Sequence, residues 1–253
     1  MTSISIVMSC YNEENNLKRG VLSELNDYIS RSNLNWEVVI TNDLSTDKSY
    51  ELLLSFAKKN KSFRILNLEK KGGKPGGIWN SIQAAKYPYV LMTDIDQSTP
   101  ISEFDKFLPF IKDSDIVIGS RGLHRNGNSF LRKIGGPVFL TLRRLVILPN
   151  IIDTQCGFKL LKTEVAKELF PHLQFFQKEK NPTGWRVSAF DVELLFMARK
   201  WGHPIKEVEV DWRNEDTSNT KGDDTSRYKK ESVQMIREII RVKRNDILGK
   251  YEK

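Results

Sequence analysis

Short apolar runs alternate with amphipathic stretches through the first half of the chain. The runs have the length and the β-branched content of strands that are buried in a sheet. Between them, apolar residues recur every three or four positions, as on one face of a helix. This alternation is typical of βαβ units, so we expect an α/β fold with a mostly parallel central sheet flanked by helices. The expected strands are Ile4–Met8, Trp36–Thr41, Phe63–Asn67, Tyr89–Thr93 and Asp115–Gly119.

The amphipathic stretches of this half predict helices whose apolar faces cover the sheet. The faces run over Leu17–Ile29, Tyr50–Ala57 and Ile78–Ala85, and the last of them follows a glycine-rich turn. A fourth stretch, Glu103–Lys112, also has an apolar helical face, but it contains Pro109, which should kink or end a helix.

The alternation of apolar runs and amphipathic stretches weakens after Gly119, and the second half of the chain predicts a mixture of short strands and helices. Polar residues 214–228 predict a mobile loop before the last helix. In that helix the pattern places Ile236 and Ile240, with Val233, toward the core. Its outward residues are expected to be Arg237, Arg241, Lys243 and Arg244. The other expected elements are a strand at Phe158–Leu161, helices at Thr163–Phe170 and Ser188–Trp201, and a half-exposed strand at Ile205–Trp212.

The segment 130–149 is strongly apolar, yet it contains four basic residues, Arg132, Lys133, Arg143 and Arg144. It is too short and too charged to span a bilayer. It suits a pair of helices lying in a membrane interface with the arginines at the headgroups. An ordinary core helix with its arginines on the solvent side explains the pattern equally well.

Composition narrows the class of protein. The chain has 253 residues, of which 39% are hydrophobic and 28% charged, as in soluble globular proteins. It shows no signal-peptide pattern and no apolar run long enough for a transmembrane helix. Its two cysteines, Cys10 and Cys156, are far apart and fit a reducing cytoplasm. The net charge of +8 favours an anionic partner: nucleic acid, a membrane surface or a phosphorylated substrate.

Two carboxylates follow the buried strand at Tyr89–Thr93. Asp94 and Asp96 are two residues apart, so in extended chain they project together from the strand end. Close carboxylates repel each other unless a positive charge lies between them. A divalent cation that also binds a phosphate would supply that charge, whereas a solvated turn is the simpler alternative.

Other loops at strand ends carry polar groups of the same kind. Asp43 follows the second strand, and ligands of parallel sheets bind at the carboxyl ends of strands, so it can share a crevice with Asp94 and Asp96. The turn Gly72–Gly77 precedes a helix; its backbone amides can approach an anion, and Lys74 adds positive charge. Helix capping is the alternative role for the polar residues of these loops.

Taken together, these motifs resemble the family 2 glycosyltransferases, whose fold is called GT-A. The resemblance covers about residues 3–215 and is most specific to the branch that glycosylates dolichyl phosphate. The second loop departs from the family's usual Asp-Asp-Gly-Ser, because Asn42 and Leu44 replace its first acid and its glycine. The matching stretches are Ser9–Glu13, Asn42–Asp47, Gly72–Gly77, Thr93–Asp96, Ile118–Arg121, Asp153–Lys159 and Phe190–Leu194.

The resemblance implies a role for each of these loops. A nucleotide sugar would be bound by Ser9, Tyr11, Glu13, Asp43, Lys74 and Asp94. Asp96, together with Asp94, would hold Mg²⁺ or Mn²⁺ on the diphosphate. Arg121 would bind the acceptor's phosphate, with pairing to a nearby acid as its alternative role. Asp191 would orient the acceptor, with capping of its helix as the alternative. We expect a single domain, 1–253, in which residues 1–125 bind the nucleotide sugar and residues 126–253, with C-terminal amphipathic helices, bind the acceptor.

The implied activity is a metal-dependent, inverting transfer of glucose or mannose. The donor would be UDP-glucose or GDP-mannose, and the acceptor a polyprenyl phosphate, dolichyl or undecaprenyl, at the cytoplasmic face of a membrane to which the protein binds peripherally. Transfer to a sugar hydroxyl in polysaccharide assembly is the alternative, with Asp191 as a true base. A nucleic-acid-binding module is disfavoured, because the aromatic residues do not interleave with the basic runs.

Overall fold

The computed structural model describes residues 2–122, 147–178, 190–213 and 224–253, with side chains in the last range from Ile236 onward. The segment 130–146 and the loop residues 214–223 therefore lie outside the described residues. Of the predicted interfacial segment only residues 147–149 are described, and Ile147 and Leu148 are buried in the core.

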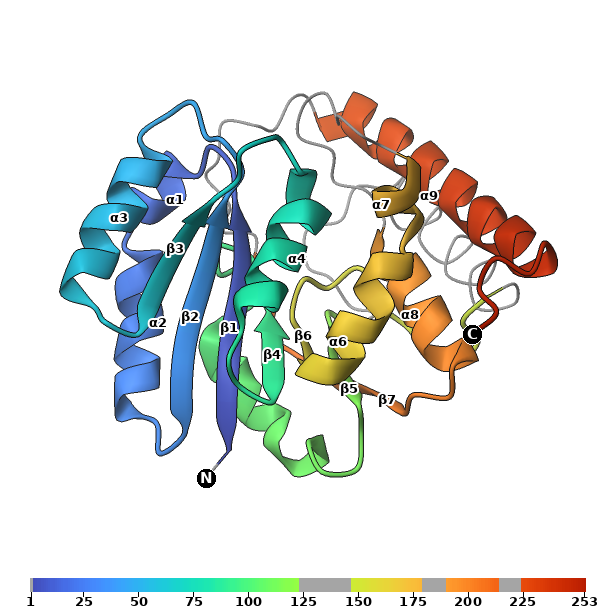
Figure 1. Ribbon diagram of the computed structural model, residues 1–253, viewed down its shortest axis with the longest axis horizontal. Helices are drawn as coiled ribbons and strands as arrows, with labels where there is room; N and C mark the ends of the chain where they lie inside the picture. Colours follow the sequence, from blue (N-terminus) through green and yellow to red (C-terminus); the bar gives the residue numbers. More distant parts are fainter. Residues whose placement is uncertain (1, 123–146, 179–189, 214–223) are drawn as a thin grey trace.

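A seven-stranded sheet organises the described chain, in the order β3-β2-β1-β4-β6-β5-β7 (Figure 1). All neighbouring strands are parallel except where β6 pairs antiparallel with β4 and β5. The expected mostly parallel, mixed sheet is thus confirmed. The strands are β1 (Ser3–Cys10), β2 (Asn35–Asn42), β3 (Phe63–Asn67), β4 (Tyr89–Met92), β5 (Ile116–Ser120), β6 (Lys159–Lys162) and β7 (Ile205–Glu209).

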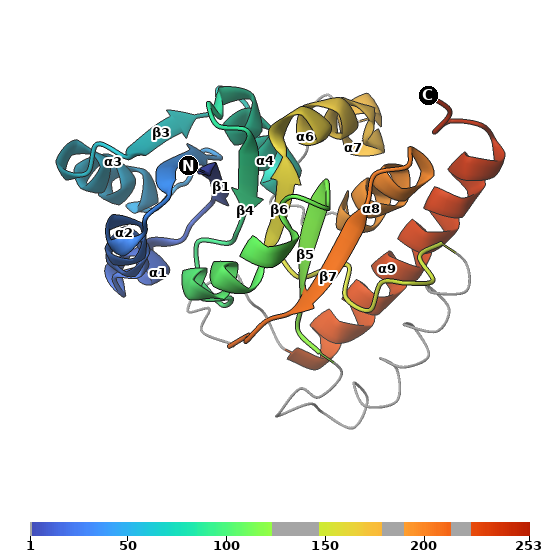
Figure 2. The ribbon, with the colours of Figure 1, turned by 90° about the horizontal axis from the view of Figure 1, so that it is seen from below.

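Helices cover both faces of the sheet, as two views at right angles show (Figures 1 and 2). They are α1 (Glu14–Lys18), α2 (Val21–Arg31), α3 (Ser49–Lys59), α4 (Gly73–Ala84), α6 (Thr163–Leu169), α7 (Gln174–Lys178), α8 (Phe190–Lys200) and α9 (Asp224–Ile247), with 3₁₀ turns η1 (Ile101–Lys106), η2 (Leu108–Phe110) and η3 (Phe170–His172).

Alternate residues of the central strands enter two separate cores. Val7 and Met92 pack with apolar residues of α4, α6 and α8 on one face of the sheet. Ile6 and Leu91 pack with residues of α2, α3 and η1 on the other face. The strands are apolar on both faces because both faces are covered, as is usual for parallel sheets.

Three helix predictions need correction. The single amphipathic face over Leu17–Ile29 is divided between α1 and α2, because Gly20 between them adopts a positive φ of 97°. The expected helix Glu103–Lys112 is two 3₁₀ turns, with Pro109 in the second. The third helix begins at Gly73 rather than Ile78, so the glycine-rich turn forms the first turn of α4, where Pro75 is tolerated.

The last helix was predicted with the wrong face inward and the wrong start. Residues 224–228, expected in the mobile loop, belong to α9. Ile236 and Ile240 are exposed, whereas Ile239 and Val242 are buried against α8 and its neighbours. Arg241, predicted to face solvent, forms an ion pair with the buried Glu193. The helix is therefore rotated relative to the sequence-based expectation.

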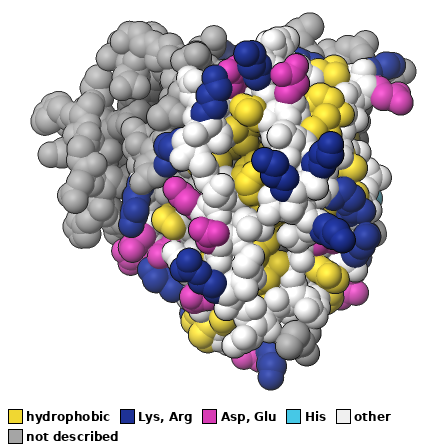
Figure 3. Space-filling view, turned by 90° about the vertical axis from the view of Figure 1, so that its left-hand side faces the viewer, with side chains coloured by type: hydrophobic (Ala, Val, Ile, Leu, Met, Phe, Trp, Pro, Cys, Tyr) yellow, Lys and Arg dark blue, Asp and Glu magenta, His cyan; other side chains and the backbone are white. Residues whose placement is uncertain are grey.

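No described helix is long and apolar enough to cross a bilayer. Charges of both signs are interspersed on the face formed by the α1–α3 side of the molecule (Figure 3).

Candidate active site

The candidate site lies where β1, β2 and β4 end. These three strands are parallel neighbours, so the loops that follow them meet at one edge of the sheet. Three non-glycine residues have a positive φ among the residues described: Asn12 (54°), Leu44 (53°) and Gln97 (49°). All three lie in these loops. Such backbone conformations cost free energy and tend to gather at functional sites, which supports the assignment of this edge.

The first two loops are held together by side-chain hydrogen bonds. Asn12 Oδ1 accepts a hydrogen bond from the Thr46 amide at 2.8 Å. The Glu13 amide donates to Ser49 Oγ at 2.8 Å. The nucleotide-binding loops predicted from the sequence therefore form one rigid unit rather than two independent turns.

The departures from the family's second loop are structurally explained. Asn42, in place of an acid, accepts a hydrogen bond from Ser45 Oγ at 2.6 Å and donates one to Asn67 Oδ1 at 2.6 Å. Leu44 stands where the family usually has glycine, and its φ of 53° lies in the left-handed region that favours glycine. The loop therefore retains the glycine-type backbone although its residue has a side chain.

Asp43 lies fully buried beneath the glycine-rich turn. Its Oδ1 accepts a hydrogen bond from the Gly72 amide at 2.7 Å. Burial raises the pKa of the carboxyl group, against the opposing effect of that amide and of Lys71. Its other oxygen, Oδ2, is buried and has no hydrogen-bond partner within the described part of the chain. An unpartnered buried acceptor of this kind suits a donor on a bound ligand, such as an N–H of a nucleobase.

Lys74, in the first turn of α4, connects the glycine-rich turn to the end of β4. Its Nζ lies 2.5 Å from Asp94 Oδ1. Burial alone would lower the pKa of Lys74, but the carboxylates of Asp94, Asp191 and Asp96 outweigh it and hold that pKa above its ordinary value. Burial would raise the pKa of Asp94, but Lys74, followed by Lys159 and Arg121, holds it below its ordinary value. The predicted acidic and basic side chains thus interact as one cluster of charges.

A glycine leaves room for the Asp94 carboxylate. A Cβ atom added to Gly157 would lie 2.2 Å from Asp94 Oδ2, closer than any real contact allows. The sequence motif around Gly157 was noted as a match to the family, but its role as the wall behind Asp94 becomes evident only in the structure.

Asp96 is fixed by its neighbours in the turn. Its Oδ1 accepts a hydrogen bond from the Ser98 amide at 2.9 Å. Its carbonyl accepts one from Arg19 Nη2 at 2.6 Å. Arg19, for which the sequence pattern predicted no role, therefore ties the turn that carries Asp94 and Asp96 to the end of α1.

The donor atoms available here fit Mg²⁺ or Mn²⁺. The described residues contain no group of three or more His, Cys, Asp and Glu side chains that could form a complete metal site. Mg²⁺ typically uses only one or two protein carboxylates and takes its other ligands from substrate phosphates and water. Asp94 and Asp96 supply oxygen ligands of that number and type.

Arg121 follows β5 and forms a two-pronged ion pair with Asp153. Its Nε and Nη2 lie 2.6 and 2.8 Å from the two carboxylate oxygens of Asp153. Arg121 also acts on the charge of Asp94, so it belongs to the same cluster. Its predicted contact with an acceptor phosphate stays a prediction, and Asp153 is a partner that the sequence did not reveal.

Asp191 lies in the first turn of α8, as predicted, and is held by a buried lysine. The Nζ of Lys159, which is 0% exposed, lies 2.7 Å from Asp191 Oδ1 and also donates to the Cys156 carbonyl. No role was predicted for Lys159 from the sequence. The available signal was a lysine among the apolar residues of a short strand, Phe158 to Leu161.

Three other predicted residues lie in or beside the loop after β1. The Tyr11 ring packs under Lys71 Nζ, 3.2 Å from the ring centroid. Glu13 Oε2 accepts a hydrogen bond from Asn16 at 2.6 Å. Ser9 packs so closely against Gly77 that a Cβ there would lie 2.1 Å from Ser9 Oγ. Their predicted contacts with a nucleotide sugar stay predictions.

Known proteins with similar sequences act on dolichyl phosphate. Dolichyl-phosphate beta-glucosyltransferase of Dictyostelium discoideum is 32% identical over 97% of this chain and 75% of its own length. The enzyme of the same name from Drosophila melanogaster is 32% identical over 85% of this chain and 68% of its own length.

Solved structures with the same fold include sugar transferases of other substrate specificity. Glucosyl-3-phosphoglycerate synthase of Mycobacterium tuberculosis, in complex with phosphoglyceric acid, superimposes with a TM-score of 0.66 at 15% identity over 95% of this chain and 80% of that one. Its complex with Mn²⁺, UDP and glucosyl-3-phosphoglycerate gives a TM-score of 0.63 at 16% identity, over 95% and 80% of the two chains. These likenesses confirm the GT-A fold.

Residues 5–170 match the family model described as glycosyl transferase family 2. The match spans more than half of the chain, and it agrees with the similarity to the beta-glucosyltransferases over most of its length. The chain therefore belongs to glycosyl transferase family 2 and is a glycosyltransferase.

Proposed function

We propose that this glycosyltransferase moves glucose from UDP-glucose to a polyprenyl phosphate such as dolichyl phosphate, with inversion at the sugar's anomeric carbon and with the help of Mg²⁺ or Mn²⁺. The similar enzymes of known name are dolichyl-phosphate beta-glucosyltransferases, which favours glucose over mannose. The mycobacterial protein with the same fold has been crystallised with Mn²⁺ and UDP, which favours a uridine nucleotide.

One arrangement carries the proposal: a continuous line of contacts from Asp43 through the glycine-rich turn to Asp94. Asp43 accepts a hydrogen bond from Gly72, and Lys74, two residues further, pairs with Asp94. In the proposed complex Asp43 binds the base. Lys74 neutralises phosphate charge beside the first turn of α4, where the positive end of the helix dipole also favours anions.

Asp94 and Asp96 would hold the divalent cation. When bound, the cation neutralises negative charge on the departing diphosphate. The remaining chemistry is displacement at one carbon. An oxygen of the acceptor phosphate forms a bond to the anomeric carbon, the bond from that carbon to the diphosphate oxygen breaks, and UDP leaves with the electron pair.

The acceptor needs no proton removed, because a phosphate monoester is already anionic near neutral pH. In this proposal Asp191 therefore orients the acceptor, held by Lys159 on one of its oxygens. A guanidinium has five N–H donors, and the pair with Asp153 does not use all of them. Arg121 contacts the acceptor phosphate with the remaining donors. The lipid part of the acceptor stays in a bilayer, so the reaction takes place at a membrane surface.

Two measurements on the whole chain test the proposal. Transfer of labelled glucose from UDP-glucose to dolichyl phosphate should require Mn²⁺ or Mg²⁺ and cease in EDTA. In thermal unfolding, UDP with Mn²⁺ should raise Tm, because a ligand that binds only the folded state stabilises it, and UDP in EDTA should have a much smaller effect. Asp96→Asn should abolish both the transfer and the effect of Mn²⁺.

Asp27→Asn, at an exposed position of α2, is the matched control and should behave as the unmodified chain. A rise in Tm with GDP but not UDP would overturn the choice of donor. Full turnover in EDTA would overturn the role of the cation, and transfer to a sugar hydroxyl but not to dolichyl phosphate would overturn the acceptor.

A further inference from the structure

Helix α9 has exposed apolar residues on one side, and two of them, Ile236 and Ile240, were predicted to be buried. Ile236 is 40% exposed, Ile240 60% and Ile247 74%, and Leu248, just past the helix, is 57% exposed. Burying such side chains is strongly favourable, so a row of them in water marks a surface that binds something.

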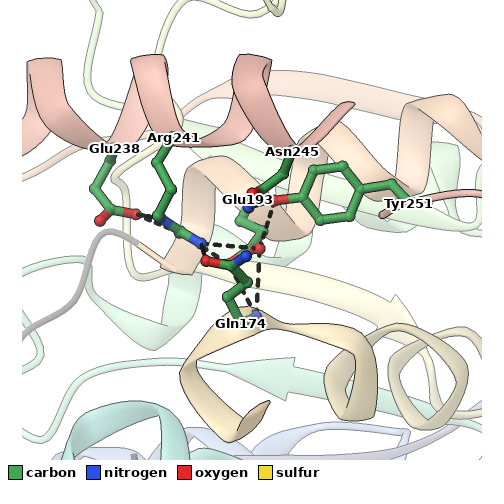
Figure 4. A network of polar contacts seen from close by, with 6 residues as sticks. All are labelled: Gln174, Glu193, Glu238, Arg241, Asn245 and Tyr251. Atoms are coloured by element: carbon green, nitrogen blue, oxygen red, sulfur yellow. Dashed lines mark hydrogen bonds and ion pairs between the residues drawn. The ribbon is translucent and has the colours of Figure 1, made fainter. Parts of the chain in front are cut away.

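A buried polar network explains why this face points outward (Figure 4). Glu193 of α8 is 1% exposed and accepts hydrogen bonds from Arg241 Nη2 at 3.0 Å and from the Tyr251 hydroxyl at 2.6 Å. Asn245 donates to the same hydroxyl at 3.2 Å. Because Arg241 and Asn245 must face Glu193, the opposite side of α9 is left facing solvent.

The exposed isoleucines form a straight stripe. Residues 236, 240 and 247 of a helix with 3.6 residues per turn fall within an arc of roughly 40°. The stripe runs along about 16 Å of the helix, at 1.5 Å per residue. The three isoleucines thus share one side of the helix, with Lys243 at the edge of the stripe between Ile240 and Ile247.

Positive charge borders this stripe. Arg237 and Arg244 are exposed beside it, and Lys250 is exposed just beyond the end of the helix. The acids in this part of α9 are used elsewhere, since Glu238 pairs with Arg241, and Asp246 pairs with Lys200 and Lys243. The face over α1–α3, by contrast, carries charges of both signs (Figure 3).

We infer that the exposed side of α9 binds an anionic membrane surface, with Ile236, Ile240 and Ile247 in the acyl boundary and Arg237 and Arg244 at the phosphate headgroups. Apolar residues flanked by arginines are the pattern of helices that lie in the plane of a membrane interface. The inference rests on the proposed function, because a polyprenyl phosphate acceptor has to be taken from a bilayer. Helix α9 packs on α8 through its opposite side, so it lies between this surface and the helix that carries Asp191.

A second copy of the chain fits the stripe less well than a membrane does. Two stripes packed against each other by a twofold axis would bring Arg237 and Arg244 of both copies together. Like charges facing each other across an interface oppose association. An anionic bilayer offers the opposite charge along the whole length of the stripe.

Co-sedimentation with lipid vesicles tests the inference without donor or acceptor. The chain should bind phosphatidylcholine vesicles that contain phosphatidylglycerol, and bind pure phosphatidylcholine more weakly. The double substitution Ile240→Ser with Ile247→Ser should weaken binding about tenfold or more, because it removes two inserted side chains. Arg237→Gln with Arg244→Gln should weaken binding to the anionic vesicles only, and added salt should have the same effect.

The control is Leu54→Ser with Leu108→Ser, which removes two exposed apolar side chains, 44% and 40% exposed, from α3 and η2 outside the stripe. This control should bind vesicles as the unmodified chain does. Equal binding by the isoleucine variant and the unmodified chain would overturn the inference. So would a dimer in analytical ultracentrifugation that the isoleucine variant converts to a monomer, which would make the stripe an interface between copies.

Two further measurements on the isoleucine variant distinguish membrane binding by α9 from the proposed transfer of glucose. The isoleucine variant should keep the Tm of the unmodified chain, because both side chains are exposed. It should also transfer glucose normally to a short, water-soluble polyprenyl phosphate, and lose transfer only to acceptor in vesicles. A chain that binds vesicles but transfers no glucose would refute the proposed function and leave the membrane surface intact.

Discussion

A single buried lysine links two parts of the candidate site that are far apart in the sequence. Lys159 lies on β6, is inaccessible to solvent and pairs with Asp191 on α8. Burying an ammonium group without a partner costs several kcal/mol of folding free energy, on the order of a broken buried pair. A lysine buried at this position therefore needs the carboxylate of Asp191. The contact fixes one oxygen of Asp191, and within the described part of the chain no hydrogen bond holds the other oxygen, which can therefore face a ligand. Lys159 is thus a positioning residue for Asp191.

Replacing Lys159 with methionine tests this role. Lys159→Met keeps the length of the side chain but releases Asp191, so kcat for glucose transfer should fall by a factor of about 10 to 100. KM for UDP-glucose should change by less than about threefold, because in the proposed function Asp191 contacts the acceptor and not the donor. Steady-state kinetics with each substrate varied in turn would measure kcat and the KM for each substrate separately.

Lys162→Met is the control, on the same strand but with its amine at the surface beside Asp115. It should leave kcat unchanged. If both variants lose the same activity, or if Lys159→Met alters KM for the donor instead of kcat, the positioning role of Lys159 is wrong.

At the scale of single residues, the sequence predicted the site where the relevant side chains are close along the chain. Asp94 and Asp96 could be placed in one site because they are two residues apart, but the extended chain assumed for them is wrong: β4 ends at Met92, and the Gln97 amide bonds to the Asp94 carbonyl in a turn. Lys159 and Asp153 could not be assigned, because their partners Asp191 and Arg121 are both 32 residues away. A motif shows which residues occur together, but not which atoms meet.

At the scale of elements, strands were predicted better than helices. The strand over Phe63–Asn67 has the predicted limits, and the next one ends at Met92, one residue early. Strand limits follow from runs of buried apolar residues, which are local. The start of α4 was misplaced because glycine and proline usually interrupt helices, whereas here both fit the first turn.

The rotation of α9 shows where periodicity fails. The helix has two apolar sides, one formed by Ile239 and Val242 and the other by Ile236 and Ile240. Periodicity cannot decide which side meets the core. The decision comes from Arg241, because its ion pair with Glu193 is possible in only one rotation of the helix.

The free energy of unfolding should therefore depend strongly on Glu193. Glu193→Gln keeps the size of the side chain but removes the charge opposite Arg241, and it should cost about 3 kcal/mol, the lower end for breaking a buried pair. Urea unfolding followed by circular dichroism would measure the loss.

Glu238→Gln is the matched control, because Glu238 pairs with the same arginine but is 24% exposed. It should cost about 1 kcal/mol or less, as is typical of pairs near the surface. Equal losses for the two variants would mean that the buried network does not hold α9 in place.

At the scale of the whole molecule, the alternation of strands and helices was enough to predict a mixed α/β sheet, and the motifs were enough to predict the GT-A fold. The position of β6 in the sheet could not be predicted from the sequence. It lies between β4 and β5 and runs antiparallel to both, although both precede it in the chain. Such an order depends on contacts between distant segments, which no local pattern records.

Ion pairs between distant segments also predict how the stability of the molecule depends on pH. Asp115 pairs with Lys162, Glu168 with Lys253, and Asp246 with Lys200. In each case the lysine holds the pKa of the carboxyl group below its ordinary value. A lowered pKa in the folded state contributes stability above the pKa of the unfolded chain, and this contribution is lost as the pH falls through the folded pKa.

Asp246 allows this dependence to be tested at a single site. Asp246→Asn should lower the free energy of unfolding by about 1 kcal/mol at pH 7, where the Asp246 carboxylate is ionised and paired with Lys200 and Lys243. As the pH falls below about 3.8, the ordinary pKa of the group, the unfolded chain takes up a proton at this carboxyl group before the folded chain does, so the difference should narrow until the folded group is protonated too. Urea unfolding at pH 7 and pH 3 would measure it, with the exposed Asp113→Asn as a control that shows little difference at either pH. A difference for Asp246→Asn that is equally large at both pH values would show that Asp246 contributes through packing rather than through its charge.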